Sequence, residues 1–130
     1  MKMQQPEAAS AILIAEDNRV LLRRMAETLA QEGYRVIEAE SGEATYAALE
    51  TDDFDLVLLD RGLGDHDGAD ILHKIRRRDT RVPVVVVSSA MGVSPGNPEI
   101  EQECDDYITK PFYPEELTAR VRRVLRRDQR

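Results

Sequence analysis

Two runs of apolar residues, at 56–59 and 82–87, constrain the fold of this chain more than any other feature. In both runs the apolar residues follow one another directly instead of alternating with polar ones. Strands with this pattern are buried on both faces, as parallel strands covered by helices on both sides are. Pro83 is tolerable only near the start of such a strand or at a sheet edge. The two runs therefore predict an α/β fold built on an open parallel sheet.

The rest of the chain alternates between strand and helix patterns. Strands are predicted at 11–15, 34–39, 56–59, 82–87 and 107–109, and helices at 19–32, 41–50, 69–78 and 114–127. Gly33 stands where the first helix would stop, and Ser41 where the second would be N-capped. Before the last strand, Pro95, Gly96 and Pro98 oppose a regular helix. We therefore predict that 91–98 is irregular and mobile, with helix confined to about 98–103.

Length and composition favour a single cytoplasmic domain. The chain has 130 residues, of which 42% are hydrophobic, enough to bury a core. We predict a flexible tail at 1–10, one domain at 11–127, and a C-terminal end or linker start at 128–130. The lone Cys104, a small apolar filler between two acids, indicates a reducing compartment because no export signal is recognised. The net charge of −7 disfavours nucleic acid as a partner, and no apolar run is long enough to span a membrane.

Polar residues follow four of the five predicted strands. They are Glu16 and Asp17, then Asp60, then Ser88 and Ser89, and finally Lys110. Because ligands of open parallel sheets bind beyond the carboxyl ends of the strands, these residues are expected to meet at one edge. Carboxylates suit Mg²⁺, an aspartate can attack phosphorus, and a lysine binds phosphate as a point charge. The set indicates Mg²⁺-dependent transfer of a phosphoryl group to Asp60.

Each of these residues, taken alone, is better explained by a structural role. An aspartate after a strand usually caps a helix or forms a turn, and Glu16 and Asp17 can cap the helix at 19–32. A single lysine is most often a solvated surface charge. Only the convergence of four strand ends favours a functional site.

Five segments, taken in this order and spacing, resemble the receiver domain of two-component response regulators. They are ILIAEDN (12–18), DLVLLD (55–60), DG (67–68), VPVVVVSSA (82–90) and DDYITKPF (105–112). The resemblance covers about 11–127 and implies a flavodoxin-like three-layer fold. Its sheet would have five parallel strands in the order 2-1-3-4-5, with five helices. The fourth helix is expected to be shortened or irregular here, for the reason given above.

The resemblance implies a phosphoacceptor and a metal site. Asp60 is similar to the acceptor, which takes its phosphoryl group from a sensor histidine kinase or a phosphotransfer protein. Glu16 and Asp17 resemble the acidic pair that holds Mg²⁺ together with Asp60 and the backbone carbonyl of Gly62. Such a domain is a signalling switch that acts on an output domain or effector. It catalyses only its own phosphorylation and dephosphorylation.

The resemblance also implies how the switch works. Ser88 resembles the hydroxyl residue that bonds the phosphoryl group, and Tyr107 resembles the aromatic residue that then turns inward. Lys110 resembles the phosphate-binding lysine, and its bond to Pro111 is typically cis in the family. Gly64 departs from the pattern because the family usually has proline there, so a looser loop is expected. Glu103 departs as well, since it replaces a usual glycine.

The segment 110–127 most resembles receivers that precede a winged-helix DNA-binding domain. Relatives of that kind pair through the last strand and helix, using charged residues. Asp106, Glu116 and Arg120 occupy matching positions, whereas Gly96 and Asn97 stand where further charges are expected. We therefore predict a monomer, or at most a weak dimer that depends on phosphorylation.

Several other interpretations are less favoured. A receiver-like interaction module that works without phosphorylation would have lost the acceptor or the acidic pair. A phosphatase with an aspartate nucleophile generally needs a second aspartate at position 62, where this chain has Gly62. Asp65, His66 and Asp67 suit a polar turn before a helix better than a metal cluster. The arginines at 120–130 are best explained as a solvated helix face, not as a nucleic-acid surface.

Overall fold

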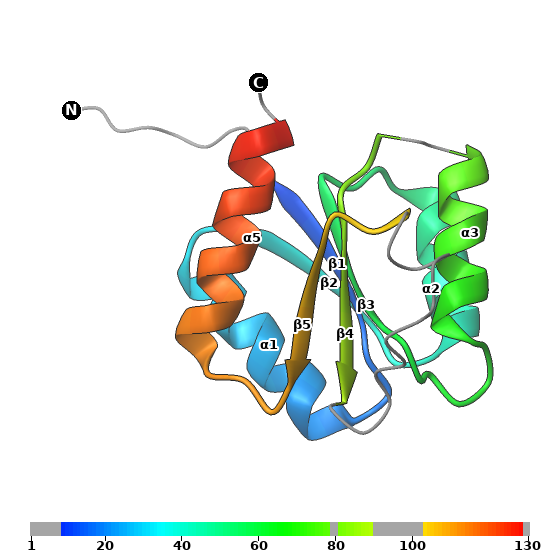
Figure 1. Cartoon of the computed structure of the whole chain (residues 1–130), viewed down its shortest axis with the longest axis horizontal. Coiled ribbons are helices and arrows are strands. Elements are labelled where there is room, and N and C mark those ends of the chain that lie inside the picture. The colour runs from blue at the N-terminus through cyan, green and yellow to red at the C-terminus, as the bar shows by residue number, and fades with distance from the viewer. Residues whose placement is uncertain (1–8, 79–80, 90–102, 129–130) are drawn as a thin grey trace.

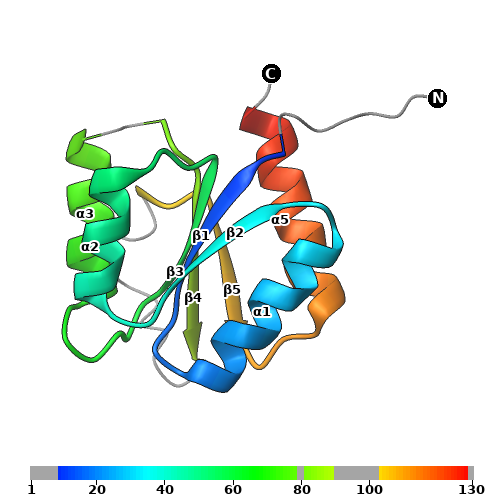
Figure 2. The same ribbon diagram turned by 180° about the vertical axis from the view of Figure 1, so that it is seen from behind.

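A five-stranded parallel sheet forms the centre of the fold, in a computed structural model that describes residues 9–78, 81–89 and 103–128. The strands are β1 (Ala11–Ala15), β2 (Arg35–Ala39), β3 (Leu56–Asp60), β4 (Val84–Ser89) and β5 (Asp106–Lys110). They lie in the order β2-β1-β3-β4-β5, so β2 and β5 are the edge strands (Figures 1 and 2). The strand order implied by the resemblance is confirmed.

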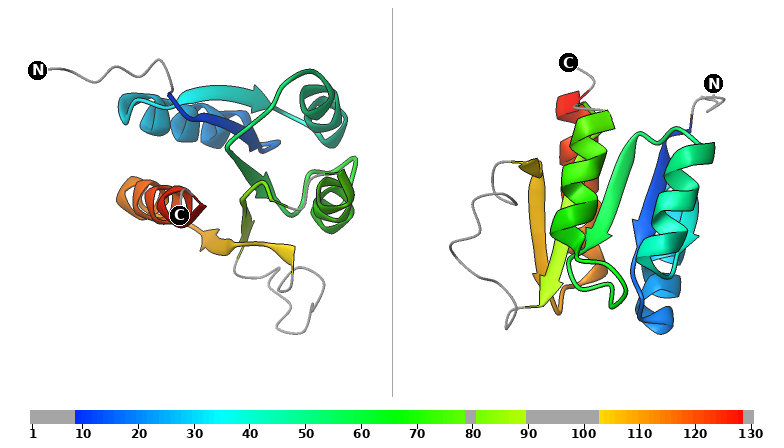
Figure 3. Two further views of the ribbon diagram at one scale, coloured as in Figure 1. Left: turned by 90° about the horizontal axis from the view of Figure 1, so that it is seen from above. Right: turned by 90° about the vertical axis from the view of Figure 1, so that its right-hand side faces the viewer.

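Helices cover both faces of this sheet. α1 (Arg19–Gln31) and α5 (Pro114–Asp128) lie on one face, and α2 (Gly42–Thr51) and α3 (Gly68–Arg78) lie on the other (Figure 3). The described part of the chain thus contains four helices, where five were predicted. The stretch predicted to be irregular, 91–98, lies outside the described residues, as does nearly all of the helix expected at about 98–103. None of the helices described has the length and apolar character needed to cross a membrane.

The side chains of each strand alternate between the two helical layers. In β1, Ile12 and Ile14 pack in the cluster with α1 and α5, while Leu13 and Ala15 pack in the cluster with α3. All residues of β1 and β3 are buried, as expected for strands covered on both faces. Because burying one such aliphatic side chain contributes about 1.5–3 kcal/mol, these strands anchor the fold and hold their carboxyl ends in place.

The fourth strand is displaced relative to its prediction. It covers Val84–Ser89 and not 82–87. Pro83 has no N–H group to donate to a ladder, so the strand begins after it. At the other end, Ser88 and Ser89 pair with the last two residues of β5. Ser88 is therefore part of the sheet and not of a loop. The other predicted elements are present within one residue of their predicted bounds.

Local backbone chemistry sets where three of the helix ends fall. The Ser41 hydroxyl accepts a hydrogen bond from Ala44 N at 3.0 Å, which confirms the predicted N-cap of α2. Gly33 follows α1 with φ of +96°, as a helix stop requires. The first residue of α3, Gly68, has to be a glycine, because a Cβ there would lie 2.6 Å from Cα of Arg61. This glycine lets α3 start directly against the end of β3.

Candidate functional site

The polar residues predicted from the strand ends gather at the carboxyl edge of the sheet, the lower edge in Figure 1. Asp60 is the last residue of β3, Lys110 is the last of β5, and Ser88 lies near the end of β4. Glu16 and Asp17 follow β1 directly. All five line one open pocket of about 750 Å³. The structure therefore brings together the side chains that the sequence placed at separate strand ends.

The ammonium group of Lys110 lies beside two of the carboxylates. Its Nζ is 2.9 Å from Oε1 of Glu16 and 3.2 Å from Oδ1 of Asp60. With Asp17, these carboxylates each offer one oxygen within 4.8 Å of the other two. Glu16 and Asp60 are buried, at 1% and 5% exposure, whereas Asp17 is exposed. Three carboxylates around one ammonium leave an excess of negative charge, and oxygen ligands of this kind suit a hard divalent cation.

The electrostatics of Asp60 reflect this crowding. Burial and the neighbouring charge of Glu16 raise the pKa of Asp60 to about 6, against the opposing effect of Lys110. For Lys110, burial lowers the pKa, but the hydrogen bond to Glu16 and the charge of Asp60 outweigh it and leave the pKa raised. At neutral pH the lysine is therefore charged, and the aspartate is ionised against a penalty that added positive charge would relieve.

Ser88 presents a buried hydroxyl that has no hydrogen-bond partner among the described residues. The residue is 3% exposed, and its Oγ makes no hydrogen bond within the described part of the chain. Buried hydroxyl groups are nearly always hydrogen-bonded, so this one stands out among the residues that line the pocket. Glu16 Oε1 also lacks a hydrogen bond of good geometry, but its 2.9 Å ion pair with Lys110 matches its charge. Val87 pairs with Asp60 across β3 and β4, which places Ser88 one position beyond the acidic residue.

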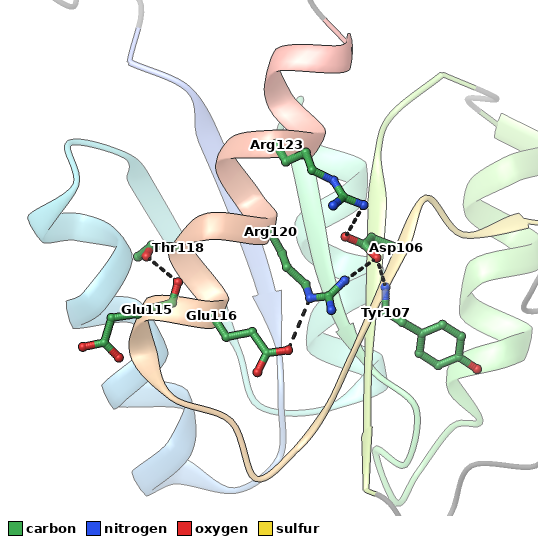
Figure 4. Close-up of polar contacts among 7 residues, drawn as sticks. All are labelled: Asp106, Tyr107, Glu115, Glu116, Thr118, Arg120 and Arg123. Carbon is green, nitrogen blue, oxygen red and sulfur yellow. Dashed lines mark hydrogen bonds and ion pairs between the residues drawn. The ribbon is translucent and has the colours of Figure 1, made fainter.

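Gly62 is one of the residues that line the pocket, whereas Tyr107 is not. Gly62 lines it and pairs with Asp67 in an isolated antiparallel bridge. Tyr107 is half-buried on β5 and packs against the core cluster on the α3 side, so it is not part of the pocket lining in the described residues. Figure 4 shows its ring on the side of β5 opposite to the Asp106 carboxylate, which faces α5. The metal role of Gly62 and the switch role of Tyr107 remain predictions.

The loop between β3 and α3 contributes pocket residues that sequence reasoning assigned to a plain turn. Asp67 caps α3, since its Oδ1 accepts a hydrogen bond from Ala69 N at 2.9 Å. Asp65 and His66 line the pocket but are not part of the acidic group suited to a metal. Arg61 lines the pocket too, and its position directly after Asp60 was the available signal. The prediction of a polar turn is confirmed.

Two further sequence predictions concern residues near the site. The Lys110–Pro111 peptide bond is cis, as the resemblance implied. Cys104 is half-buried against the core, and burial together with Asp105 raises the pKa of its thiol to about 11. A thiol with that pKa stays protonated at neutral pH, consistent with its interpretation as an apolar filler.

An open parallel sheet that carries an acidic triad and a lysine at its carboxyl edge defines a class of flavodoxin-like domains built around a buried aspartate. A family model described as the response regulator receiver domain matches residues 12–122. The chain belongs to this family and is a receiver domain of the two-component type, which confirms the resemblance seen in the sequence. Receivers of this family are signalling switches.

The relatives point to the winged-helix branch of the family. The chain is 40% identical over 116 residues to the response regulator protein PmrA of Pseudomonas aeruginosa, covering 89% of this chain and 52% of that protein. It is 35% identical to the transcriptional regulatory protein BasR of Escherichia coli, with 89% and 52% covered. The chain thus spans about half the length of the curated relatives that it matches.

Solved structures agree with this assignment. A CheY-like receiver domain protein from Methanospirillum hungatei superposes with a TM-score of 0.88 at 25% identity, over 94% of this chain and 98% of that one. The response regulator DrrB of Thermotoga maritima, described as an OmpR/PhoB homologue, superposes with a TM-score of 0.82 at 30% identity. That match covers 92% of this chain and 54% of DrrB.

Proposed function

We propose that this receiver takes a phosphoryl group onto a carboxylate oxygen of Asp60. The observation that carries the proposal is the position of this side chain: it is buried at the pocket's inner wall, with the Lys110 ammonium 3.2 Å from its Oδ1. A new bond forms between Asp60 Oδ and phosphorus while the bond from phosphorus to the donor's leaving atom breaks. The donor is a phosphohistidine of a sensor histidine kinase or of a phosphotransfer protein.

Mg²⁺ is the proposed cofactor, and the residues present suit it. Glu16, Asp17 and Asp60 would hold it through carboxylate oxygens, with the backbone carbonyl of Gly62 as a further ligand. The raised pKa of Asp60 supports this proposal, because burial and Glu16 create an excess of negative charge that a cation neutralises. When bound, the ion supplies positive charge for the equatorial oxygens of the transferred group. Lys110 supplies the second positive charge as a point-charge phosphate binder.

The switch is proposed to start at Ser88. Its unpartnered Oγ would donate a hydrogen bond to the phosphoryl group, and such a bond exists only in the phosphorylated state. Tyr107 would then turn inward and change the surface of β5 and α5. The domain catalyses only its own phosphorylation and dephosphorylation. These residues bias a two-state element, which is how a local charge acquires a distant readout.

The similarity to transcription regulators supports a proposal about the downstream partner of this receiver. We propose that the receiver, bounded at 11–127, signals to an output domain or effector in the cytoplasm and makes no direct contact with nucleic acid. The net charge of −7 supports the last point. The alternative is an interaction module that works without phosphorylation. It is disfavoured because an intact acidic triad with a matched lysine has no use in such a module.

Phosphorylation of the isolated chain tests the proposal. A small-molecule phosphodonor with Mg²⁺ is expected to add one phosphoryl group to the wild type and none to Asp60→Asn, as measured by intact-mass analysis. The site itself supplies positioning and charge, so no kinase is needed. Asp53→Asn, an exposed carboxylate outside this pocket, serves as the control and should be labelled like the wild type. Equal labelling of Asp60→Asn and the wild type would refute the assignment.

A further inference from the structure

The junction between β2 and α2, residues 39–43, touches both loops that carry the proposed metal ligands. On one side it holds the loop after β1. The backbone N–H of Glu16 donates to the carbonyl oxygen of Ala39 at 3.0 Å. The Arg19 side chain at the start of α1 pairs with Glu40 at 2.9 Å. The loop that presents the acidic pair is therefore hydrogen-bonded to this junction, and the helix that follows the loop is linked to it by an exposed ion pair.

On its other side the same junction holds the loop after β3 through Asp65. The Asp65 carboxylate accepts hydrogen bonds from Gly42 N at 2.8 Å and from Glu43 N at 3.1 Å, one on each oxygen. Those N–H groups belong to the first turn of α2, where no intrahelical acceptor exists and a negative charge is favoured. The two hydrogen bonds lower the pKa of Asp65, so this carboxylate stays ionised and keeps both acceptors available at neutral pH.

His66 reinforces this contact by packing on a glycine. A Cβ at Gly42 would lie 2.6 Å from Cβ and Cδ2 of His66, so only glycine leaves room for the imidazole. The His66 ring also meets the Tyr46 ring edge-on at 5.1 Å between centroids. Two neighbouring residues of the β3–α3 loop therefore dock on α2.

The backbone of the β3–α3 loop has an unusual conformation at Gly64. Gly64 has φ of +87°, a conformation that proline cannot adopt because its ring fixes φ near −65°. The loop therefore follows a path that a proline could not hold. It also passes close to the acidic pair, since a Cβ at Gly64 would lie 3.5 Å from Oδ2 of Asp17.

A displacement of Asp65 would also move the end of the loop that carries the proposed metal ligands. Gly68 N donates to the carbonyl oxygen of Arg61 at 2.8 Å, and Gly62 bridges to Asp67. These bonds close residues 61–68 into one compact turn. Asp65 sits at the tip of that turn, and Asp60 and Gly62 lie at its base.

We propose that Asp65 is a positioning residue, which sets the distance between the two ligand-bearing loops by fixing the β3–α3 loop to the first turn of α2. The proposal rests on the proposed function of the pocket, because it names what controls the affinity of that pocket for a divalent cation. Asp65 is not one of the proposed metal ligands. It acts through the loop that carries Gly62 and through the shared junction at 39–43.

Replacing Asp65 by alanine tests the proposal, with Asp55→Ala as the matched control. Both changes remove an aspartate that accepts a backbone hydrogen bond, but Asp55 bonds Ala11 N at 2.7 Å, at the start of β1 and outside the pocket. Mg²⁺ titration by calorimetry is expected to show about tenfold weaker binding for Asp65→Ala, the size usual for groups that orient metal ligands. Asp55→Ala should lower the melting temperature and leave the Mg²⁺ dissociation constant unchanged.

A second measurement, made without Mg²⁺, separates this proposal from the proposed function. Hydrogen–deuterium exchange of amides 61–67 should quicken in Asp65→Ala and stay unchanged in Asp55→Ala. If the wild type binds no Mg²⁺, the proposed function fails, and the exchange data still report whether Asp65 holds the loop. Unchanged exchange in Asp65→Ala, or equal loss of Mg²⁺ affinity in both variants, would overturn the positioning role.

Discussion

At the scale of single residues, ionisation of the buried Asp60 carboxyl lowers the stability of the folded state. Its pKa is raised to about 6 from an ordinary value of 3.8, first by burial and then by Glu16. The folded state therefore holds this proton more tightly than the unfolded chain does. The sign follows directly: between about pH 4 and pH 6 the unfolded state loses its proton first, so stability falls as pH rises through this window. A charge that opposes folding is then available to a cation or a phosphoryl group.

This conflict predicts a stabilising substitution. In the absence of Mg²⁺, Asp60→Asn should unfold at higher urea concentration than the wild type at pH 8, with a gain of up to about 3 kcal/mol for a shift of two pKa units. The gain should shrink by more than about 1 kcal/mol on going to pH 5, because the wild-type carboxyl is then largely protonated. An Asp60→Asn variant no more stable than the wild type at pH 8 would show that ionisation of this carboxyl group does not destabilise the fold.

Asp17 carries the complementary prediction for the metal. Saturating Mg²⁺ should stabilise the wild type by about 2–3 kcal/mol at a hundredfold excess over its dissociation constant. Asp17→Asn should reduce this gain, because within the described residues this exposed carboxylate is the member of the triad whose charge is not matched by an ion pair with Lys110. Glu27→Gln, an exposed acid on α1, is the control. Melting curves of the wild type that are indifferent to Mg²⁺ would argue against a metal site here.

At the scale of elements, Arg76 joins α3 to the beginning of both β4 and β5. Its guanidinium donates to the carbonyl oxygens of Val82 at 2.6 Å and Glu103 at 2.8 Å, and to Oδ2 of Asp105 at 2.8 Å. Asp105 Oδ2 also accepts from Val84 N at 2.8 Å. The Arg76 side chain is only 14% exposed and that of Asp105 is 35% exposed, so the guanidinium is largely removed from water and the carboxylate only in part. One side chain thus aligns two strand starts whose carboxyl ends carry Ser88 and Lys110.

Arg76→Ala should therefore be far more damaging than its neighbour Arg77→Ala. Removing the guanidinium takes one donor away from each of two carbonyl oxygens and from the Asp105 carboxylate, which keeps its hydrogen bond from Val84 N, and this is expected to cost about 1–3 kcal/mol. Arg77 is exposed on the same helix and should change stability by no more than about 0.5 kcal/mol when truncated. Urea unfolding of the three proteins provides the comparison, and similar midpoints for both variants would contradict the role given to Arg76.

The elements also show what the sequence could and could not predict. Apolar runs located the strands, and the residues after them located Asp60, Lys110 and the acidic pair, because strand direction alone brings carboxyl ends together. The predicted start of β4 was wrong because the apolar run begins at Val82 and Pro83 was accepted near the start of the strand, whereas the strand begins after this residue, which has no N–H group. The contacts of Asp65 with Gly42, 23 positions away, and of Arg76 with Asp105, 29 positions away, leave no local pattern. Such long-range polar contacts depend on how elements pack.

At the scale of the whole molecule, the surface of β5 and α5 carries a network of ion pairs made within the chain (Figure 4), although Asp106 Oδ2 accepts no hydrogen bond within the described residues. Arg120 lies 2.9 Å from Asp106 Oδ1 and 3.3 Å from Glu116 Oε2, and Arg123 lies 4.0 Å from Asp106 Oδ2. The Asp106 side chain is 11% exposed. The charges that the resemblance assigns to pairing between copies are therefore already matched internally, and an interface would have to share or break these contacts.

This arrangement supports the prediction of a monomer. Exposed ion pairs contribute only about 0–1 kcal/mol each, so exchanging internal pairs for pairs between copies yields little net gain. Gly96 and Asn97 add no charge to such an interface. Sedimentation velocity should show a monomer without a phosphoryl mimic and at most a weak dimer with beryllium fluoride and Mg²⁺. Arg120→Ala should lower stability, because it leaves Asp106 without its nearest cation, yet the protein should remain monomeric without the mimic. A tight dimer of the unmodified wild type would show that apolar contacts outweigh these charges.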